Sequence, residues 1–139
     1  MKTLIINGSP RPDGNTVSLI RELKKHLEGE VVEVSAFYSN IAPCVDCRGC
    51  WQTAKCVVDD GMQVIYEDDF DNVVVASPVY YGTLPGSVLS LMSRLQPWHG
   101  SLRMEFPCCC LHTGWKGLCC YLRLCRKSRP CRRQNRRRA

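Results

Sequence analysis

Thr3-Leu-Ile-Ile-Asn-Gly-Ser-Pro-Arg-Pro-Asp-Gly-Asn-Thr-Val-Ser18 joins a short apolar segment to a helical one through a polar turn that contains glycine. The apolar run at residues 4–6 is typical of a parallel strand that is buried on both faces. Within residues 16–27 the apolar positions recur at helical spacing: Val17, Ile20, Leu23 and Leu27. The change from strand to helix therefore falls inside the loop.

This loop gathers groups that bind anions. A helix that begins near Asn15 points its unpaired backbone N–H groups and the positive end of its dipole at the loop. Side-chain donors are supplied by Ser9, Arg11, Asn15, Thr16 and Ser18. The loop has neither the Gly-Lys-Ser/Thr ending of a P-loop nor the Gly-x-Gly-x-x-Gly of a dinucleotide turn. We expect a terminal phosphate monoester here; the alternative is an ordinary polar connection.

The order of elements along the chain predicts an α/β fold. Glu30–Ser35 and the apolar Asn72–Ser77 read as further strands, and residues 84–95 return to helical spacing. Strands that alternate with helices predict a doubly wound parallel sheet with three αβα layers. In the flavodoxin-like version the first and third strands are neighbours, and the ligand crevice lies at their carboxyl ends. Residues 9–18 and 77–82 then lie side by side.

The loop after the third predicted strand suits a planar ligand. Pro78 fixes a bend, and Gly82 lets the backbone approach a ligand closely. Tyr80 and Tyr81 offer ring faces on which an aromatic group could lie. In the alternative interpretation these tyrosines only pack against a helix.

Charge and cysteine content divide the chain. Residues 1–100 hold 8 Lys and Arg against 12 Asp and Glu, whereas residues 101–139 hold 11 against 1. Seven of the 11 cysteines also fall after residue 100. We therefore expect one domain over residues 1–100, followed by a basic tail rich in Cys and Arg over residues 101–139.

No signal peptide or run of membrane-spanning length is expected, because Met1-Lys2 leads directly into a strand of four or five apolar residues. We expect a cytoplasmic protein without membrane contact. In that reducing setting the cysteines are thiols or metal ligands rather than disulfides.

Residues 7–16 (Asn-Gly-Ser-Pro-Arg-Pro-Asp-Gly-Asn-Thr) and 77–86 (Ser-Pro-Val-Tyr-Tyr-Gly-Thr-Leu-Pro-Gly) resemble the two flavin mononucleotide loops of the NAD(P)H-dependent FMN reductase family. The resemblance covers about residues 1–98. It implies that FMN phosphate is held by Ser9, Arg11, Asn15 and Thr16. It also implies that the isoalloxazine ring is lined by Pro78, Val79, Tyr80, Tyr81 and Gly82. The implied activity passes electrons from a nicotinamide through FMN to a quinone, flavin, azo compound or protein.

A second motif holds four cysteines at close spacing: Cys44, Cys47, Cys50 and Cys56. Four thiolates at this spacing can surround one cubane cluster. The motif resembles that of iron–sulfur flavoproteins, a branch of the same family, and thus implies a [4Fe–4S] cluster. Free or redox-active thiols and zinc are the alternatives, and zinc sites usually pair two Cys-x-x-Cys units across a longer spacer.

The tail departs from the family pattern. A full member supplies further strands and another flavin-contacting loop after residue 100, whereas residues 108–139 show neither strand alternation nor a helical stripe. We therefore expect the fold to be truncated after the third strand and its helix. The abrupt change in charge suggests an out-of-frame reading after about Gly100, which DNA sequencing across residues 98–103 would test. Nucleic-acid binding is disfavoured, because aromatic residues are sparse and the first part is acidic.

Two functions from different classes follow. The first is an FMN-dependent NAD(P)H oxidoreductase with a small-molecule or protein electron acceptor. The second is a catalytically incomplete flavodoxin-like fragment that acts as a binding module. A homodimer or higher homo-oligomer is expected, since the resemblance implies one and the open edge of a three-stranded sheet would promote association.

Overall fold

The computed structural model describes residues 1–100, 102–103, 109–112, 118–123 and 125–126. In chain order the elements are β1 (Lys2–Asn7), α1 (Asn15–Lys24), β2 (Glu30–Ser35), α2 (Gly49–Thr53), α3 (Gln63–Tyr66), β3 (Asn72–Ser77), α4 (Gly86–Ser93), the 3-10 helix η1 (Gln96–Gly100), β4 (Leu102–Arg103), β5 (Cys109–His112), β6 (Leu118–Arg123) and β7 (Cys125–Arg126).

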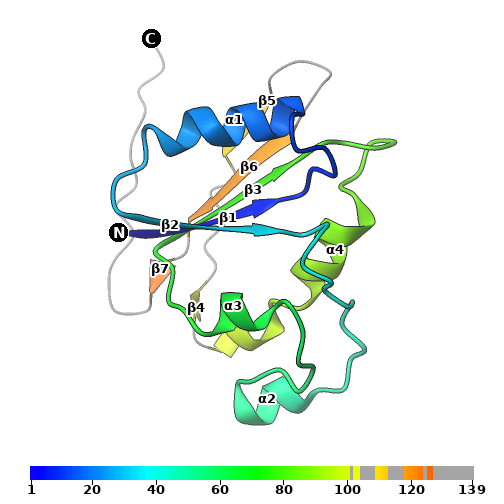
Figure 1. Ribbon diagram of the computed structural model, residues 1–139. Coiled ribbons are helices and arrows are strands. Elements are labelled where there is room, and N and C mark those ends of the chain that lie inside the picture. Colours follow the sequence, from blue (N-terminus) through cyan, green and yellow to red (C-terminus); the bar gives the residue numbers. More distant parts are fainter. Residues whose placement is uncertain (101, 104–108, 113–117, 124, 127–139) are drawn as a thin grey trace.

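Three neighbouring strands of the sheet are parallel. β1 lies between β2 and β3, with Leu4 opposite Val32 on one side and Val73 on the other. Helix α1 covers one face of the sheet, and α3 and α4 lie on the opposite side (Figure 1). The predicted flavodoxin-like doubly wound α/β fold with three layers is thus confirmed, including the neighbouring first and third strands.

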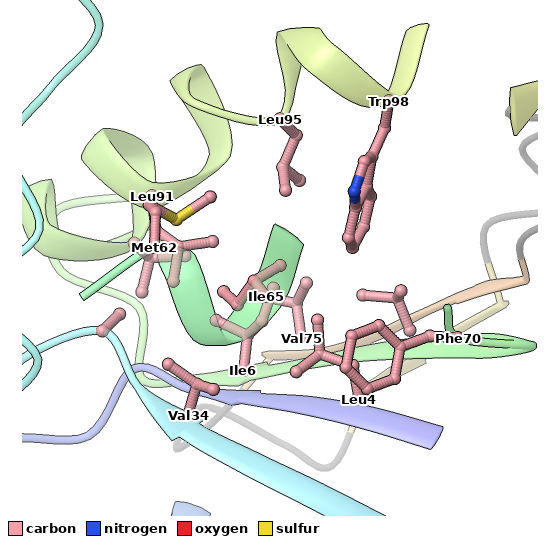
Figure 2. Close-up of a cluster of buried hydrophobic side chains, with 13 residues drawn as sticks. Leu4, Ile6, Val34, Met62, Ile65, Phe70, Val75, Leu91, Leu95 and Trp98 are labelled. Carbon is pink, nitrogen blue, oxygen red and sulfur yellow. The ribbon is translucent and has the colours of Figure 1, made fainter. Parts of the chain in front are cut away.

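The core has two parts because the central strands bury both of their faces. Leu4 and Ile6 of β1 point into the cluster under α3 and α4, where Trp98 also packs (Figure 2). Ile5 points the other way, into a smaller cluster with Ile20 of α1. Burying each such aliphatic side chain contributes about 1.5–3 kcal/mol, which explains the uninterrupted apolar runs in β1 and β3.

The sheet continues beyond β3 with antiparallel strands. Its full order is β2-β1-β3-β6-β5, and a separate pair joins β4 to β7. From the sequence we expected no strand after residue 100, and this was wrong for the described parts of that region. The run Leu118-Cys-Cys-Tyr-Leu122 is apolar without alternation, so a search for alternation missed it.

The predicted division into a domain and a basic tail stays a prediction. Residues 101, 104–108, 113–117, 124 and 127–139 lie outside the described part of the chain, which includes most of the Arg-rich segment. The hypothesis of a changed reading frame is likewise untested. Within the described residues, no helix is both long enough and apolar enough to cross a lipid bilayer.

Candidate functional site

The loop after β1 passes directly against the carboxyl end of β3. The Gly8 N–H donates to the Ala76 carbonyl at 2.8 Å. A Cβ atom on Gly8 would lie 2.4 Å from Cγ2 of Val88 and 2.7 Å from Oγ of Ser77, so a side chain does not fit there. The structure thus brings the start of the 9–18 loop against the start of the 77–82 loop, as predicted. Both loops lie at one end of the sheet, near α4 (Figure 1).

Hydrogen bonds between residues close in the sequence fix the shape of the first loop. Asn7 Oδ1 accepts from the Ser9 backbone N–H at 2.9 Å. The Ser9 hydroxyl donates to the Arg11 carbonyl at 3.1 Å and accepts from the Arg11 N–H at 3.2 Å. Ser9 is buried, so its hydroxyl shapes the turn. Thr16 is buried as well, whereas Arg11, Asn15 and Ser18 are exposed. Asn7 in turn donates from Nδ2 to Glu33 Oε1 at 2.9 Å, which ties the loop to β2.

Glu33 carries its negative charge at the edge of this site. Partial burial disfavours ionisation, but Lys24 Nζ at 2.5 Å and the Asn7 amide outweigh burial and lower the pKa of Glu33. The charged carboxylate therefore stays available as an acceptor for Asn7. Neither Asn7 nor Glu33 was predicted from the sequence, since their contact joins positions 26 residues apart.

Helix α1 begins with unused backbone donors. Its N-cap Gly14 is extended, and among the described residues no side chain caps the helix and no acidic residue lies in its first turn. The first backbone hydrogen bond of the helix runs from the Ser18 N–H to the Gly14 carbonyl, at 3.0 Å. The Ser18 hydroxyl donates to the same carbonyl at 3.3 Å. The N–H groups of Asn15 and Thr16 precede that bond, so they can bind an anion beside the exposed Arg11.

The second loop is a tight turn that exposes its aromatic rings. Tyr80 and Thr83 exchange two backbone hydrogen bonds, at 2.9 and 3.0 Å. Between them Tyr81 and Gly82 have φ values of 49° and 76°, a conformation that Gly adopts easily and Tyr rarely does. Tyr81 is fully exposed, and Tyr80 and Val79 are about half exposed. Neither tyrosine is buried against a helix, which favours the ligand-stacking interpretation over the packing alternative.

The four predicted cysteines gather around one pocket. It is lined by Cys44, Asp46, Cys47, Arg48, Cys50, Trp51, Cys56, Arg94 and Gln96. All four cysteines are free thiols; Cys44 and Cys47 are exposed, whereas Cys50 and Cys56 are half-buried. Burial raises the pKa of Cys50, and the neighbouring thiols raise it further. The loop that holds them contains three non-glycine residues at positive φ, namely Asp46, Arg48 and Ala54.

Four thiols line this pocket, but they do not form a ready site for a single ion. Among the described residues, no three His, Cys, Asp or Glu side chains converge on one metal position. A zinc site needs every sulfur about 2.3 Å from the same ion. In a cubane each thiolate binds a different iron, so its four cysteines do not share one ion.

Arg94, which follows α4, was not predicted as part of this region. Its side chain is almost fully buried, and its guanidinium pairs with Asp60 at 2.8 Å. Burial disfavours the charged form, but Asp60 and Cys56 outweigh it and raise the pKa of Arg94 above its ordinary value. Leu91, three residues before it, and Leu95, which follows it, are both buried, so Arg94 lies on the buried side of the segment. An arginine among buried leucines was the sequence feature that could have indicated this role, because a buried cation requires a partner.

A family model described as NADPH-dependent FMN reductase matches residues 1–105. The chain belongs to this family. Among curated relatives, an iron–sulfur flavoprotein of Methanocaldococcus jannaschii is 34% identical over 102 residues, which cover 70% of this chain and 53% of that protein. An iron–sulfur flavoprotein of Methanosarcina thermophila is 36% identical over 99 residues, covering 68% and 52%. One of Archaeoglobus fulgidus is 32% identical over 103 residues, covering 70% and 47%.

The chain spans about half the length of the curated relatives it matches. No solved structure matches it. Membership of the FMN reductase family confirms the resemblance inferred from residues 7–16 and 77–86. These relatives are named iron–sulfur flavoproteins, which is the branch that the four-cysteine motif resembles.

Proposed function

We propose that this chain binds FMN between the loops that follow β1 and β3 and acts as a flavin-dependent oxidoreductase. The observation that carries the proposal is the contact of Gly8 with Ser77, which joins an uncapped helix start to an exposed aromatic turn. Family membership supports the same ligand. An anionic end and a flat ring are the two features that these loops would recognise together.

Each loop has a separate role in the proposed site. The phosphate receives the guanidinium of Arg11, the side-chain amide of Asn15 and the backbone N–H groups of Asn15 and Thr16. Ser9 and Ser18 keep the turn and the first helical turn in shape. The ring lies along the second loop: Pro78, Val79, Tyr80, Tyr81 and Gly82. When bound, flavin supplies the hydride and electron chemistry. The residues orient the ring and exclude water from one side of it.

The proposal also includes an electron donor and an electron acceptor. NADH or NADPH would supply electrons, and a quinone, a flavin or a protein would receive them. A cytoplasmic setting and a homodimer or higher homo-oligomer also belong to it. The free state of the four described cysteines suits a reducing compartment.

Flavin fluorescence titration of Arg11→Ala/Asn15→Ala tests the phosphate site. Losing one charged and one neutral hydrogen-bond partner is expected to weaken FMN binding by about 2–4 kcal/mol. Lys25→Ala, at the other end of α1, removes a cation away from the loop and serves as the control. Unchanged affinity for FMN in the double variant would exclude a phosphate site at this loop.

We propose further that the four-cysteine pocket holds a [4Fe–4S] cluster that exchanges single electrons with the flavin. Its support is the gathering of four free thiols around one pocket. After anaerobic reconstitution, Cys50→Ser is expected to lose iron and sulfide, whereas Cys131→Ser, which leaves the motif intact, should keep them. Equal iron and sulfide in Cys50→Ser and the unchanged chain would exclude a cluster at this pocket.

The competing function is a binding module without catalysis. The colour of the purified protein separates the candidates: yellow for FMN, brown for FMN with a cluster, and colourless for the module. A protein that is colourless as purified, and again colourless after FMN addition and removal of unbound flavin by gel filtration, would favour the module.

A further inference from the structure

Arg94 stands in an unusual position, at the wall of the cysteine pocket and almost without exposure to solvent. Only 2% of its surface is accessible. A guanidinium in such a place needs a partner for its charge and acceptors for its N–H groups. The structure provides these partners at the two ends of the segment that carries the four cysteines, residues 43–59, which we call the cysteine loop.

One guanidinium closes both ends of this loop. Arg94 Nη1 donates to the Ala42 carbonyl at 3.0 Å and to Asp60 Oδ2 at 2.8 Å. Nη2 donates to the Val58 carbonyl at 3.2 Å and to Asp60 Oδ1 at 3.3 Å. Ala42 precedes the first cysteine of the motif and Val58 follows the last, so all four thiols lie between the two points of attachment. The planar fork of arginine suits this task, whereas a lysine cannot reach the same set of acceptors.

Three neighbouring hydrogen bonds strengthen the attachment. Asp60 Oδ2 also accepts from the Ala42 N–H at 3.0 Å, and Oδ1 accepts from the Met62 N–H at 3.0 Å. Ser93 Oγ accepts from the Cys44 N–H at 3.0 Å, which joins the first cysteine to the end of α4. The loop is therefore held at its base by the segment that ends α4, rather than by a strand.

One donor of Arg94 remains unused. Its Nε is buried and makes no hydrogen bond of good geometry among the described residues. The Cys56 thiol lies beside the guanidinium and helps to raise the pKa of Arg94. A buried donor without an acceptor is unfavourable, so an anionic sulfur ligand in the pocket would satisfy it.

We propose that Arg94 is the positioning residue of the cysteine pocket: it closes the base of the loop and donates its spare N–H to the sulfur-ligated group held there. The hydrogen bond to the bound group rests on the proposed cluster. The closing of the loop by Arg94 does not depend on what the four thiols bind. Positive charge and hydrogen bonds near a cluster raise its reduction potential, so Arg94 would also set that potential.

The loop is tested first, in the protein without added iron. Arg94→Met/Asp60→Asn removes both charges together, because removing only one would leave the other buried and unpaired. Amide hydrogen exchange in residues 43–59 and alkylation of the two half-buried thiols, Cys50 and Cys56, are expected to quicken about tenfold or more, while β1 and β3 keep their protection. Lys55→Gln removes a cation from the same loop without touching Arg94, and it should leave both rates unchanged.

Arg94→Lys provides the second variant, which keeps the charge and loses the fork. It should open the loop to an intermediate degree. Exchange and alkylation at unchanged rates in either Arg94 variant, with the sheet still protected, would overturn the proposal. If the double variant fails to fold, the lysine variant decides alone.

The potential is tested next, in the reconstituted protein. Arg94→Lys should hold iron and sulfide but show a shifted midpoint potential, and Arg94→Met/Asp60→Asn should show a lower potential or lose the cluster. A merely structural arginine would leave the potential of the lysine variant unchanged, and that result would overturn the electronic role. Absence of iron from the unchanged chain would instead refute the proposed cluster, and the loop measurements would still judge the role of Arg94 at the loop.

Discussion

The flavin loop at residues 8–18 and the cysteine loop at residues 43–59 leave the same end of the sheet, but they are stabilised differently. The flavin loop runs from a buried strand into a helix, and its turn is fixed by hydrogen bonds between residues two apart, such as Ser9 with Arg11. The cysteine loop contains only the short helix α2, and Arg94 holds it from 34 to 52 positions away.

This difference explains what the sequence could reveal. A loop whose contacts are local carries its shape in its own residues, so its position between strand and helix could be predicted. A loop held by a distant side chain shows its chemistry in the sequence, here four cysteines, but not its support. The flavin loop should therefore tolerate changes in α4 that leave Gly8 its space, and the cysteine loop should not tolerate loss of Arg94.

The largest expected effect comes from removing the distant support. Arg94→Ala leaves the Asp60 carboxylate buried without its partner and should lower the free energy of unfolding by about 3–5 kcal/mol. Arg21→Ala is the matched control, because Arg21 forms an exposed ion pair with Asp13 at 3.3 Å, and such pairs contribute little. Urea denaturation of both variants provides the measurement. A loss in Arg94→Ala no larger than that in Arg21→Ala would mean that the buried pair does not support the loop.

A smaller effect is expected from crowding the flavin loop. Gly8→Ala places a Cβ against Val88 and Ser77 and should destabilise the chain by about 1–3 kcal/mol while weakening FMN binding. Gly86→Ala is the control, since no atom within the described residues lies within 4 Å of its Cβ position. Thermal unfolding and flavin titration would report the two effects. Full stability and affinity in Gly8→Ala would contradict the close approach of the two flavin loops.

The smallest effect concerns the tie between the flavin loop and β2. The lowered pKa of Glu33 means that its ionised form stabilises the fold above the ordinary pKa of 4.5, and that this contribution is lost as the pH falls through the lower folded value. Glu33→Gln should therefore flatten the pH dependence of stability below about pH 5 and cost less than about 1 kcal/mol at neutral pH. Urea denaturation of both proteins at several pH values measures this. Identical pH profiles would show that Glu33 does not contribute through its charge.

Boundaries predicted from the sequence were most accurate where burial and pattern agree. Glu30–Ser35 and Asn72–Ser77 are strands β2 and β3, as expected. The helix expected at residues 84–95 is shorter, because Pro85 occupies its N-cap position and a 3-10 turn begins at Gln96. Helix α1 likewise ends at Lys24, before the last apolar residue of its pattern. These ends depend on local backbone geometry that periodicity does not encode.

The proposed phosphate donors and the tyrosines of the second loop could be named from residue types, whereas the Asn7–Glu33 and Arg94–Asp60 contacts could not. Each of those contacts joins side chains from separate elements, and their pairing follows only from the sheet order and the packing of α4. The antiparallel strands β5 and β6 escaped prediction because the run at residues 118–122 does not alternate, and because the pairing of β6 with β3 and of β5 with β6 joins distant parts of the chain.

Backbone amide NMR during FMN addition tests the central claim most directly. The largest chemical-shift changes are expected at residues 9–18 and 79–83, with small changes in residues 43–58. Riboflavin, which lacks the phosphate, should bind more weakly and shift residues 79–83 without the full response of Asn15 and Thr16. Shifts concentrated away from both loops, or equal responses to FMN and riboflavin at the start of α1, would contradict a flavin site at this end of the sheet.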